Sequence, residues 1–591
     1  MATFRGRLSL LVLLLPLIAP TATCIREAPP HAPQRLLRIA PEGASPTIAA
    51  VVAGGVERQA LLSSARYRVH LPTKALLAFS LAAQAPPDAE TRGFLYLTVR
   101  ADGKEVGERR INLRTERSFR DATLEFDGPG RRGLLELELS LRSGSGQPRP
   151  VPPGTTLAVA DPLLLDTSGL ADRRGVILIS IDTLRRDHLG LYGYDKPTSP
   201  ALDALGRQGL VADDAVSVSS WTLPSHFSMV TSLEPAAHGA IDNGHTFNRR
   251  APTLAVMFRE AGWLTHAVTS HLYVSEQYGF DEGFEALDYA FDRRAREVAD
   301  RAISFLDRVG PRPFFLFLHL YDPHLNYNPP PETLRILEPE PYTGGMKGNR
   351  SSFARRTRAS TDPRDLAHLL ALYDAEIRHA DDELGRVFAR LRDLGLEETT
   401  LIAVTSDHGE EFLDHDAWEH RSTLYEELIR IPLLFRGPGI EGGRRLPAQV
   451  SLLDVAPTIL DWARMPSLPT ARGQSLLRPL PDREAYGETE LGKGIPKGMT
   501  RKLFLRGGAS SWKAILTFEP KDGTPVGEEW FDLAADPRET RTAPPPEAAA
   551  AALRSRLLKR WQDARRQGEG AMPVDLSPEQ LEQLRALGYV N

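Results

Sequence analysis

Two hydrophobic patterns follow one another along the chain, and the first is an alternation of apolar and polar positions. Between residues 35 and 168, short segments such as ARYRVHLP, GFLYLTVRA and LLELELSLRS alternate in this way and are separated by Gly, Pro and Asp. A period of two residues is typical of strands with one buried face, and regularly spaced strands of this kind close into a sandwich or barrel. We therefore predict an N-terminal β-sandwich over 35–168. Because it contains no His/Asp/Glu cluster with ligand spacing, a packing or spacer role is favoured over carbohydrate binding.

The second pattern begins near residue 172. Continuous apolar runs, among them GVILIS, PFFLFLHLYD and TLIAVTS, alternate with segments of helical periodicity such as AREVADRAISFLDRVG. Uninterrupted β-branched runs are typical of strands buried on both faces, and their alternation with helices indicates parallel strand-helix-strand units. Over 172–480 we predict an α/β domain with a largely parallel sheet and helices on both faces.

The last segment, 481–591, is predicted to be a small strand-rich subdomain that ends in a helix. LFLRGGASSWKAILTFEP and EEWFDLAADPRET have strand-like patterns, whereas SPEQLEQLRALGY has helical periodicity. Ser577 stands where an N-cap is expected, with Glu579 and Gln580 in the first turn.

Residues 1–24 have the layout of an export signal. Arg5 and Arg7 precede the apolar run LSLLVLLLPLIA, which is too short for a comfortable membrane span, and small residues follow it. Cys24 comes directly after this stretch, which leaves two outcomes open: a lipidated Cys24 that tethers the protein to a membrane, or an ordinary cleaved signal. Both predict an exported protein of the periplasm or cell envelope, with the Pro-rich residues 25–34 as a linker.

Composition changes this picture little. The 591 residues are 41% apolar and 25% charged with a formal net charge of -5, which is typical of a globular protein and gives no reason to expect nucleic acid as a partner. Because the chain has 1 cysteine, it forms no intrachain disulfide.

Polar groups gather where the predicted strands end. Asp182 follows VILISI, Asp407 and His408 follow LIAVTS, and the run FLFLHLYDPH contains His319, Asp322 and His324. Ligands of α/β folds bind at the carboxyl ends of the strands, and a carboxylate beside a neutral imidazole suits Zn or Mn. An Asp after a strand is usually a cap or turn residue, so the adjacent Asp and His are the stronger signal.

The stretch SSWTLPSHFS, residues 219–228, is a further candidate. Locally it predicts the start of a helix, with Thr222 as the N-cap and Pro224 in the first turn. A helix N-terminus is also a favourable place for an anion. Whether Thr222 reacts or only caps the helix depends on what the fold brings beside it.

Several long motifs, in order along the chain, resemble the sulfatase-like branch of the alkaline phosphatase superfamily. They are VILISIDTLRRDHLGLYGYDKPTSPALDALGRQGL, SWTLPSHFSMVTSLEPAAHG, PFFLFLHLYDPH and VTSDHGEEFLDHDAWEHRSTLYEELIRIPLLFRGPG, and the similarity runs from about 174 to 540. The resemblance implies an alkaline-phosphatase-like domain that binds a metal and acts on an anionic ester. The β-rich residues 35–168 lie outside it.

The resemblance also implies a set of metal ligands. Asp182 matches the first metal-binding aspartate of the family, and Asp407 with His408 match the pair at the other strand end. Formylglycine sulfatases have a second aspartate ligand directly after the first. Here that position is Thr183, so this ligand is left open.

The position of the nucleophile departs most from formylglycine sulfatases, which have Cys or Ser in a Cys/Ser-x-Pro-x-Arg pattern. Pro224 aligns this pattern so that Thr222 takes the Cys/Ser place and His226 the Arg place, and formylglycine is therefore not expected. Superfamily members with a Thr nucleophile cleave or transfer phosphoesters, which implies a metal-bound Thr222 and a covalent phospho-threonine. His324 matches a histidine that contacts the transferred group or the leaving group, and His420 resembles a further substrate-side histidine. His226 and His324 are predicted to act with Thr222 in catalysis.

Three functions remain open at this point. The leading one is an exported metal-dependent hydrolase or transferase of phosphoester or phosphonate substrates through a covalent Thr222 intermediate. The second is a sulfuric ester hydrolase without formylglycine, and the third is a non-catalytic binding protein on the same scaffold. One divalent metal is favoured over two, because Asp322-x-His324 has the wrong spacing for the two-zinc relatives, but His415 and His420 leave a second metal site open. Zn or Mn is preferred, with Ca or Mg as alternatives. The long Arg-rich loop 326–362 either contacts the anionic substrate or is solvated.

Overall fold

The computed structural model describes most of the chain after the predicted linker. The described residues are 33–586 without 54–55, 85–93, 113–119, 144–145, 153–154, 169–173, 492–499, 508–510, 519–524, 569, 572 and 575. The predicted export signal, Cys24 and most of the linker lie outside these ranges. No helix in the described part is both long and apolar enough to span a bilayer.

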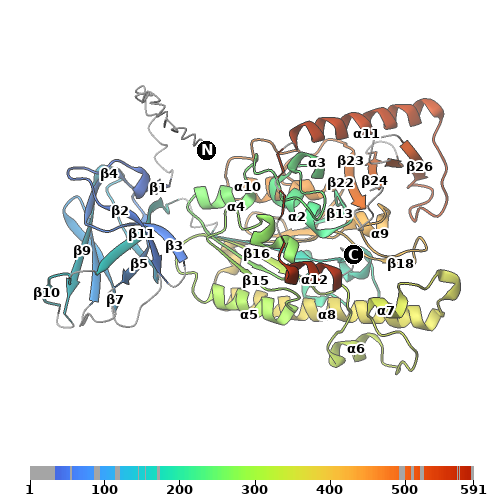
Figure 1. The fold of residues 1–591 in the computed structure, drawn as a ribbon, viewed down its shortest axis with the longest axis horizontal. Helices are drawn as coiled ribbons and strands as arrows, with labels where there is room; N and C mark the ends of the chain where they lie inside the picture. Colours follow the sequence, from blue (N-terminus) through green and yellow to red (C-terminus); the bar gives the residue numbers. More distant parts are fainter. Residues whose placement is uncertain are drawn as a thin grey trace, which may run out of the picture.

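Two antiparallel sheets form the N-terminal region (Figure 1). The first has the order β2-β3-β11-β5-β8 with β1 beside β11, and the second has the order β10-β9-β6-β7 with β4 beside β9. Their inner faces share one hydrophobic core that includes Tyr67, Phe79 and Leu97, so the two sheets form a sandwich. The strands are β1 Gln34–Arg35, β2 Ile48–Ala53, β3 Val56–Leu61, β4 Ala65–Leu71, β5 Ala75–Gln84, β6 Phe94–Ala101, β7 Lys104–Asn112, β8 Arg120–Phe126, β9 Arg131–Arg142, β10 Pro148–Arg149 and β11 Thr156–Asp166.

A nine-stranded sheet is the centre of the following α/β region. Its order is β15-β14-β16-β12-β17-β21-β13-β20, with β22 beside β13. The strands are β12 Gly175–Ile181, β13 Leu210–Val216, β14 Leu264–Thr269, β15 Ala286–Tyr289, β16 Phe314–Leu320, β17 Thr400–Ser406, β20 Arg430–Ile431, β21 Leu433–Arg436 and β22 Arg444–Ser451, and a separate hairpin pairs β18 Glu411–Phe412 with β19 Trp418–Glu419.

The sheet is mixed but mostly parallel, as predicted, and the sequence pattern does not locate the reversal. Strands β14, β15, β16, β12 and β17 run parallel, but β21 pairs antiparallel with both β17 and β13. A buried apolar run such as LLFR has the same composition in either direction, so the pattern cannot report the direction of β21.

Helices cover both faces of this sheet, as predicted (Figure 1). Alternate residues of β12 enter two different cores. Val176 and Leu178 pack in the core with α2, α4 and α10, whereas Ile177 and Ile179 pack in the core with α1, α5 and α8. The helices are α1 Pro200–Arg207, α2 Thr222–Thr231, α3 Pro235–His238, α4 Leu254–Glu260, α5 Ala295–Leu306, α6 Pro331–Leu337, α7 Arg350–Phe353, α8 Pro363–Asp393, α9 Glu426–Ile429 and α10 Val455–Trp462.

The C-terminal region is a four-stranded antiparallel sheet and two helices. Helix α11, Glu547–Gln567, packs Leu553, Leu557 and Trp561 onto one face of this sheet. Helix α12, Pro578–Ala586, begins after Ser577 as predicted, and Ser577 and Gln580 exchange hydrogen bonds. The strands are β23 Ala485–Leu491, β24 Thr500–Arg506, β25 Trp512–Phe518 and β26 Pro525–Asp532.

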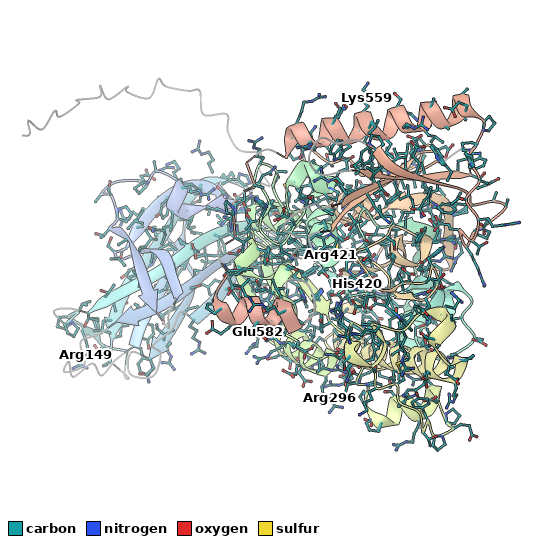
Figure 2. All side chains as sticks on the ribbon, turned by 45° about the vertical axis from the view of Figure 1, so that its right-hand side comes forward. Arg149, Arg296, His420, Arg421, Lys559 and Glu582 are labelled. Atoms are coloured by element: carbon teal, nitrogen blue, oxygen red, sulfur yellow. The ribbon has the colours of Figure 1, made fainter. Side chains whose placement is uncertain are left out.

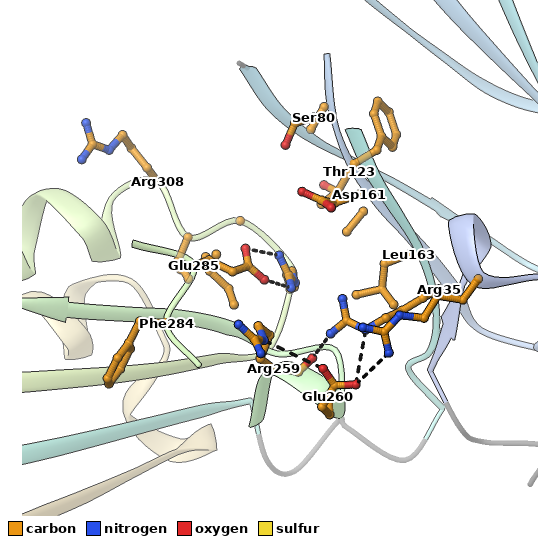
Figure 3. Close-up of a pocket in the computed structure, with 18 residues that line it drawn as sticks. Arg35, Ser80, Thr123, Asp161, Leu163, Arg259, Glu260, Phe284, Glu285 and Arg308 are labelled. Atoms are coloured by element: carbon orange, nitrogen blue, oxygen red, sulfur yellow. Dashed lines mark hydrogen bonds and ion pairs between the residues drawn. The ribbon is translucent and has the colours of Figure 1, made fainter. Parts of the chain in front are cut away.

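A polar cleft of about 550 Å³ lies where the sandwich meets the α/β region (Figure 3). Arg35 of the sandwich donates to the carbonyl of Arg259 and pairs with Glu260, and Arg312 pairs with Glu285 within the α/β region. Leu264, which also lines the cleft, is the first residue of β14. The sandwich therefore contacts the amino end of the parallel strands, at the edge opposite to the predicted chemistry.

Candidate metal centre and nucleophile

Three adjacent strands bring the predicted polar groups to one edge of the sheet. Strand β12 lies between β16 and β17, and Ile181 is in register with Leu320 on one side and with Ser406 on the other. Asp182 and Asp407 therefore follow neighbouring strands at the same level. Both carboxylates are fully buried.

The structure places Thr222 at this edge through helix α2. Trp221 is the N-cap residue, it makes no side-chain cap bond, and Thr222 is the first helical residue. The predicted capping role of Thr222 is therefore wrong by one position. Its hydroxyl is fully buried and lies 3.5 Å from Nε2 of His408, at the end of the helix where the dipole favours an anion.

Asp182, Asp407 and His408 offer ligand atoms that all lie within 4.8 Å of one another. Both oxygens of Asp182 and Oδ2 of Asp407 are buried and have no hydrogen-bond partner among the described residues. A buried carboxylate that lacks partners is costly unless a cation neutralises it. These three residues, which are three of the four predicted ligands, therefore fit a divalent metal ion. The fourth predicted ligand, Thr222, lies beside them.

The ring of His408 is oriented for the same ion. Nδ1 donates to the carbonyl of Gly409 at 2.9 Å, so Nε2 faces Oδ2 of Asp407 at 3.3 Å and Oδ1 of Asp182 at 3.6 Å. Burial disfavours the charged ring, but Asp407 and Asp182 outweigh it and raise the pKa of His408 to about 9. Burial and the neighbouring Asp407 raise the pKa of Asp182 to about 7. Without a metal, protons take the place of the cation.

Metal binding should consequently release protons. Because the pKa values of Asp182 and His408 are raised to about 7 and about 9, a metal must displace protons that these groups hold below those pH values. We expect the apparent affinity for Zn²⁺ to rise from pH 6 to pH 9, by about tenfold per pH unit for each proton released. Calorimetry in buffers of different ionisation enthalpy measures the proton count. An affinity that does not change with pH would contradict this protonation of the site.

His324 and His420 lie together beside the candidate metal centre. Their ring centroids are 5.0 Å apart, and the His420 ring is 4.5 Å from that of His408. Nδ1 of His324 donates to the carbonyl of Leu325, and burial lowers the pKa of His324. The side chain of His420, which is labelled in Figure 2, is 6% exposed, and its Nδ1 lies 3.0 Å from Oε1 of Glu410. Glu410 stands directly after the DHG stretch, but no local pattern in the sequence predicts that it is the partner of His420.

His226 lies one turn after Thr222 in α2 and contacts its backbone. Its Nδ1 is 2.8 Å from the carbonyl of Thr222 and donates to it, and Nε2 is 3.0 Å from the hydroxyl of Ser180, which donates in turn. Burial lowers the pKa of His226 to about 4, so the ring is neutral. Both nitrogens are thus used within the protein, at the first turn of α2.

A second group of carboxylates and imidazole is explained without a metal. Glu411, His415 and Glu427 lie within ligand distance of one another. However, Nδ1 of His415 contacts Glu427 at 2.7 Å and Nε2 contacts the carbonyl of Glu539 at 3.2 Å, and these contacts raise the pKa of His415 to about 9, against the effect of burial. Both nitrogens then carry protons, so His415 is an imidazolium and does not serve the candidate metal centre.

The Arg-rich loop is held by ion pairs. Arg350 pairs with Glu419, Arg358 pairs with Asp416, and Arg356 pairs with a carboxylate of α8. The loop was predicted either to contact an anionic substrate or to be solvated. The pairs of Arg350 and Arg358 anchor it to the segment that follows His408.

Comparisons with known proteins identify the family of the α/β region. A family model described as Sulfatase matches residues 174–465. The chain is 23% identical over 449 residues to an arylsulfatase of Clostridium perfringens, covering 62% of this chain and 89% of that protein. It is 34% identical over 199 residues to arylsulfatase K of Gallus gallus, covering 32% of this chain and 36% of that protein.

A solved structure shows the same fold. The phosphonate monoester hydrolase of Agrobacterium radiobacter superposes with a TM-score of 0.54 at 20% sequence identity, covering 66% of this chain and 96% of that one. The match of the family model includes Asp182, Thr222, Asp407 and His408. Residues 174–465 therefore form a hydrolase domain of the sulfatase family, within the alkaline phosphatase superfamily.

Proposed function

We propose that this protein is a metal-dependent hydrolase or transferase of phosphoester or phosphonate substrates, with Thr222 as the nucleophile. The observation that carries the proposal is the place of Thr222: a buried hydroxyl at the first position of α2, 3.5 Å from His408 in the candidate metal centre. Thr222 has a hydroxyl group, and threonine is not one of the two residues, Cys and Ser, from which formylglycine is made. The chemistry proposed is therefore direct attack by the alkoxide.

Reaction at Thr222 has two displacements. In the first, Oγ of Thr222 forms a bond to phosphorus while the bond from phosphorus to the leaving oxygen breaks; the hydroxyl proton is released and the leaving oxygen takes up a proton. In the second, the oxygen of water or of an acceptor alcohol forms a bond to phosphorus, the bond to Oγ breaks, and the Thr222 hydroxyl is regenerated. A divalent metal, when bound, favours the alkoxide and neutralises charge on the transferred group.

His324 and His420 are proposed to serve the substrate side. The Nδ1 proton of each ring points to an oxygen within the protein, at Leu325 and Glu410 respectively, which assigns proton exchange with substrate to Nε2. Glu410 orients His420 in the way that a carboxylate orients the base of a catalytic triad. The positive end of α2 adds a fixed field for the developing negative charge.

His226 is proposed to be a positioning residue, because both of its nitrogens are bonded to Thr222 and Ser180. We expect His226→Leu to lower kcat by about 100-fold, because it releases the carbonyl of Thr222 and shifts the nucleophile. The pH profile should keep its shape, and His226→Gln should recover part of the rate. A displaced pH profile in His226→Leu would indicate a proton-transfer role instead.

Sulfate ester hydrolysis is the second candidate function. It is favoured by the family match and by the arylsulfatase of Clostridium perfringens, whereas the phosphonate monoester hydrolase of Agrobacterium radiobacter shares the fold. The deciding experiment is a panel of aryl phosphate monoesters, phosphodiesters, phosphonates and sulfates, each assayed with Zn²⁺, Mn²⁺, Ca²⁺ and Mg²⁺. Turnover of the sulfate alone would overturn the phosphoester proposal. Turnover of none of them would favour the binding-protein alternative.

A further inference from the structure

One buried imidazole beside the candidate metal centre has no role in the proposed function. His319 is the penultimate residue of β16, in register with Ser180 of β12, and it is fully buried. Its Nε2 lies 3.4 Å from Oδ2 of Asp182. The resemblance to the sulfatase-like branch assigned nothing to this position.

Hydrogen bonds to Ser270 determine which nitrogen of His319 carries the proton. The Ser270 hydroxyl lies 2.7 Å from the backbone carbonyl of His319 and 2.9 Å from its Nδ1. A carbonyl only accepts, so the one hydroxyl proton of Ser270 is donated to it. Nδ1 must then be the donor to the hydroxyl oxygen, and Nε2 of the neutral ring carries a lone pair.

When Asp182 is ionised, as metal binding requires, two acceptors therefore face one another in a fully buried site. Nε2 of His319 and Oδ2 of Asp182 have no hydrogen-bond partner among the described residues, and only 3.4 Å separates them. Buried acceptors without a donor are costly, and a cation that both atoms coordinate removes the cost. The ring of His226, whose centroid is 4.9 Å away, is a contrast, because its two nitrogens are both bonded.

Asp182 directs its two oxygens to two different imidazoles. Oδ1 lies 3.6 Å from Nε2 of His408, and Oδ2 lies 3.4 Å from Nε2 of His319. At the same time position 183 offers a threonine where formylglycine sulfatases supply a carboxylate. The carboxylate that formylglycine sulfatases have at position 183 is therefore absent from this chain. Nε2 of His319, which carries a lone pair, instead faces the carboxylate of Asp182.

We propose that Nε2 of His319 is a ligand of the same divalent ion that Asp182, Asp407 and His408 bind, with Ser270 fixing the tautomer. The inference rests on the metal site of the proposed function and is independent of the ester that is cleaved. Two imidazoles and two carboxylates form a ligand set that favours Zn²⁺ or another first-row transition metal over Ca²⁺ or Mg²⁺. The exchange of a carboxylate for an imidazole therefore changes the preferred metal.

X-ray absorption of the zinc-loaded full chain tests this directly by counting imidazole ligands. We expect one zinc ion per chain with two imidazoles, one imidazole in His319→Gln, and two in the matched control His226→Gln, which alters the adjacent buried ring. Competition with a chelator should show the Zn²⁺ affinity lowered about 100-fold in His319→Gln, and about 10-fold in Ser270→Ala, which leaves the ring in place but releases its tautomer.

Other results of these measurements would contradict the proposed role of His319. One imidazole per zinc in the unaltered chain, two zinc ions per chain, or an unchanged affinity in both variants would overturn the assignment of His319. If His319→Gln does not fold, as judged by circular dichroism of the metal-free protein, the affinity of Ser270→Ala decides. The imidazole count and the Zn²⁺ affinity are measured without turnover. They can therefore contradict the role of His319 without contradicting the role of Thr222, and the assays of Thr222 can fail without contradicting the role of His319.

Discussion

Replacement of Thr222 by Ala is expected to lower kcat for a phosphoester substrate by about 10⁴-fold or more, since the variant lacks the hydroxyl that is proposed to attack phosphorus. Thr222→Ser keeps an alcohol at the first position of α2 and should retain activity within about tenfold of the unaltered protein. Rapid quenching of the unaltered enzyme, followed by mass spectrometry of the peptide that contains Thr222, should show a phosphoryl group on this residue. The same peptide from Thr222→Ala should show none.

The control for this experiment is the metal content of the Thr222→Ala variant. Asp182, Asp407 and His408 remain in Thr222→Ala, so the variant should still bind one metal ion, with a modest loss of affinity. Lost activity with retained metal assigns the defect to the nucleophile. Activity that persists in Thr222→Ala would remove Thr222 from the mechanism, whatever the metal content.

The sequence predicts the strand-end carboxylates because their signal is local. Asp182 and Asp407 each follow a run of seven buried residues, and a buried apolar strand between helices already implies a common edge for its carboxyl end. The alternating pattern of the N-terminal region and the cap at Ser577 are equally local, and the structure contains the corresponding sheets and helix.

Other features depend on contacts that no local pattern records. The approach of Thr222 to His408 requires α2 to begin at the edge of a sheet assembled from strands that are far apart in sequence. The direction of β21 also depends on its pairing with distant strands, so the local sequence pattern does not predict it. The roles of the histidines also depend on such contacts. Both nitrogens of His226 are bonded, to Thr222 and Ser180, whereas Nε2 of His319 faces the carboxylate of Asp182.

Replacement of Asp182 by Asn is expected to abolish metal binding and yet to stabilise the metal-free protein by roughly 1–3 kcal/mol at pH 8. The carboxylate is buried beside Asp407, and these surroundings raise the pKa of Asp182 to about 7. A group whose pKa is raised on folding stabilises the protein fully below its unfolded value near 3.8, and this contribution is lost as the pH rises to about 7. The advantage of Asp182→Asn should therefore grow between pH 4 and pH 7 and stay constant above.

Saturating Zn²⁺ should invert this order, because it stabilises only the protein that binds it, by about 2.7 kcal/mol when the free ion is at 100 times its Kd. Thermal unfolding of both proteins, with a chelator and with Zn²⁺, measures the two orders. Asp374→Asn is the matched control: Asp374 is equally buried but accepts hydrogen bonds from Tyr194 and Lys196, so its replacement should destabilise the protein in either condition. If Asp182→Asn is destabilised in chelator as Asp374→Asn is, then Asp182 is an ordinary structural carboxylate. If it is stabilised there, the fold holds two unneutralised acceptors at the end of β12 in order to bind a cation.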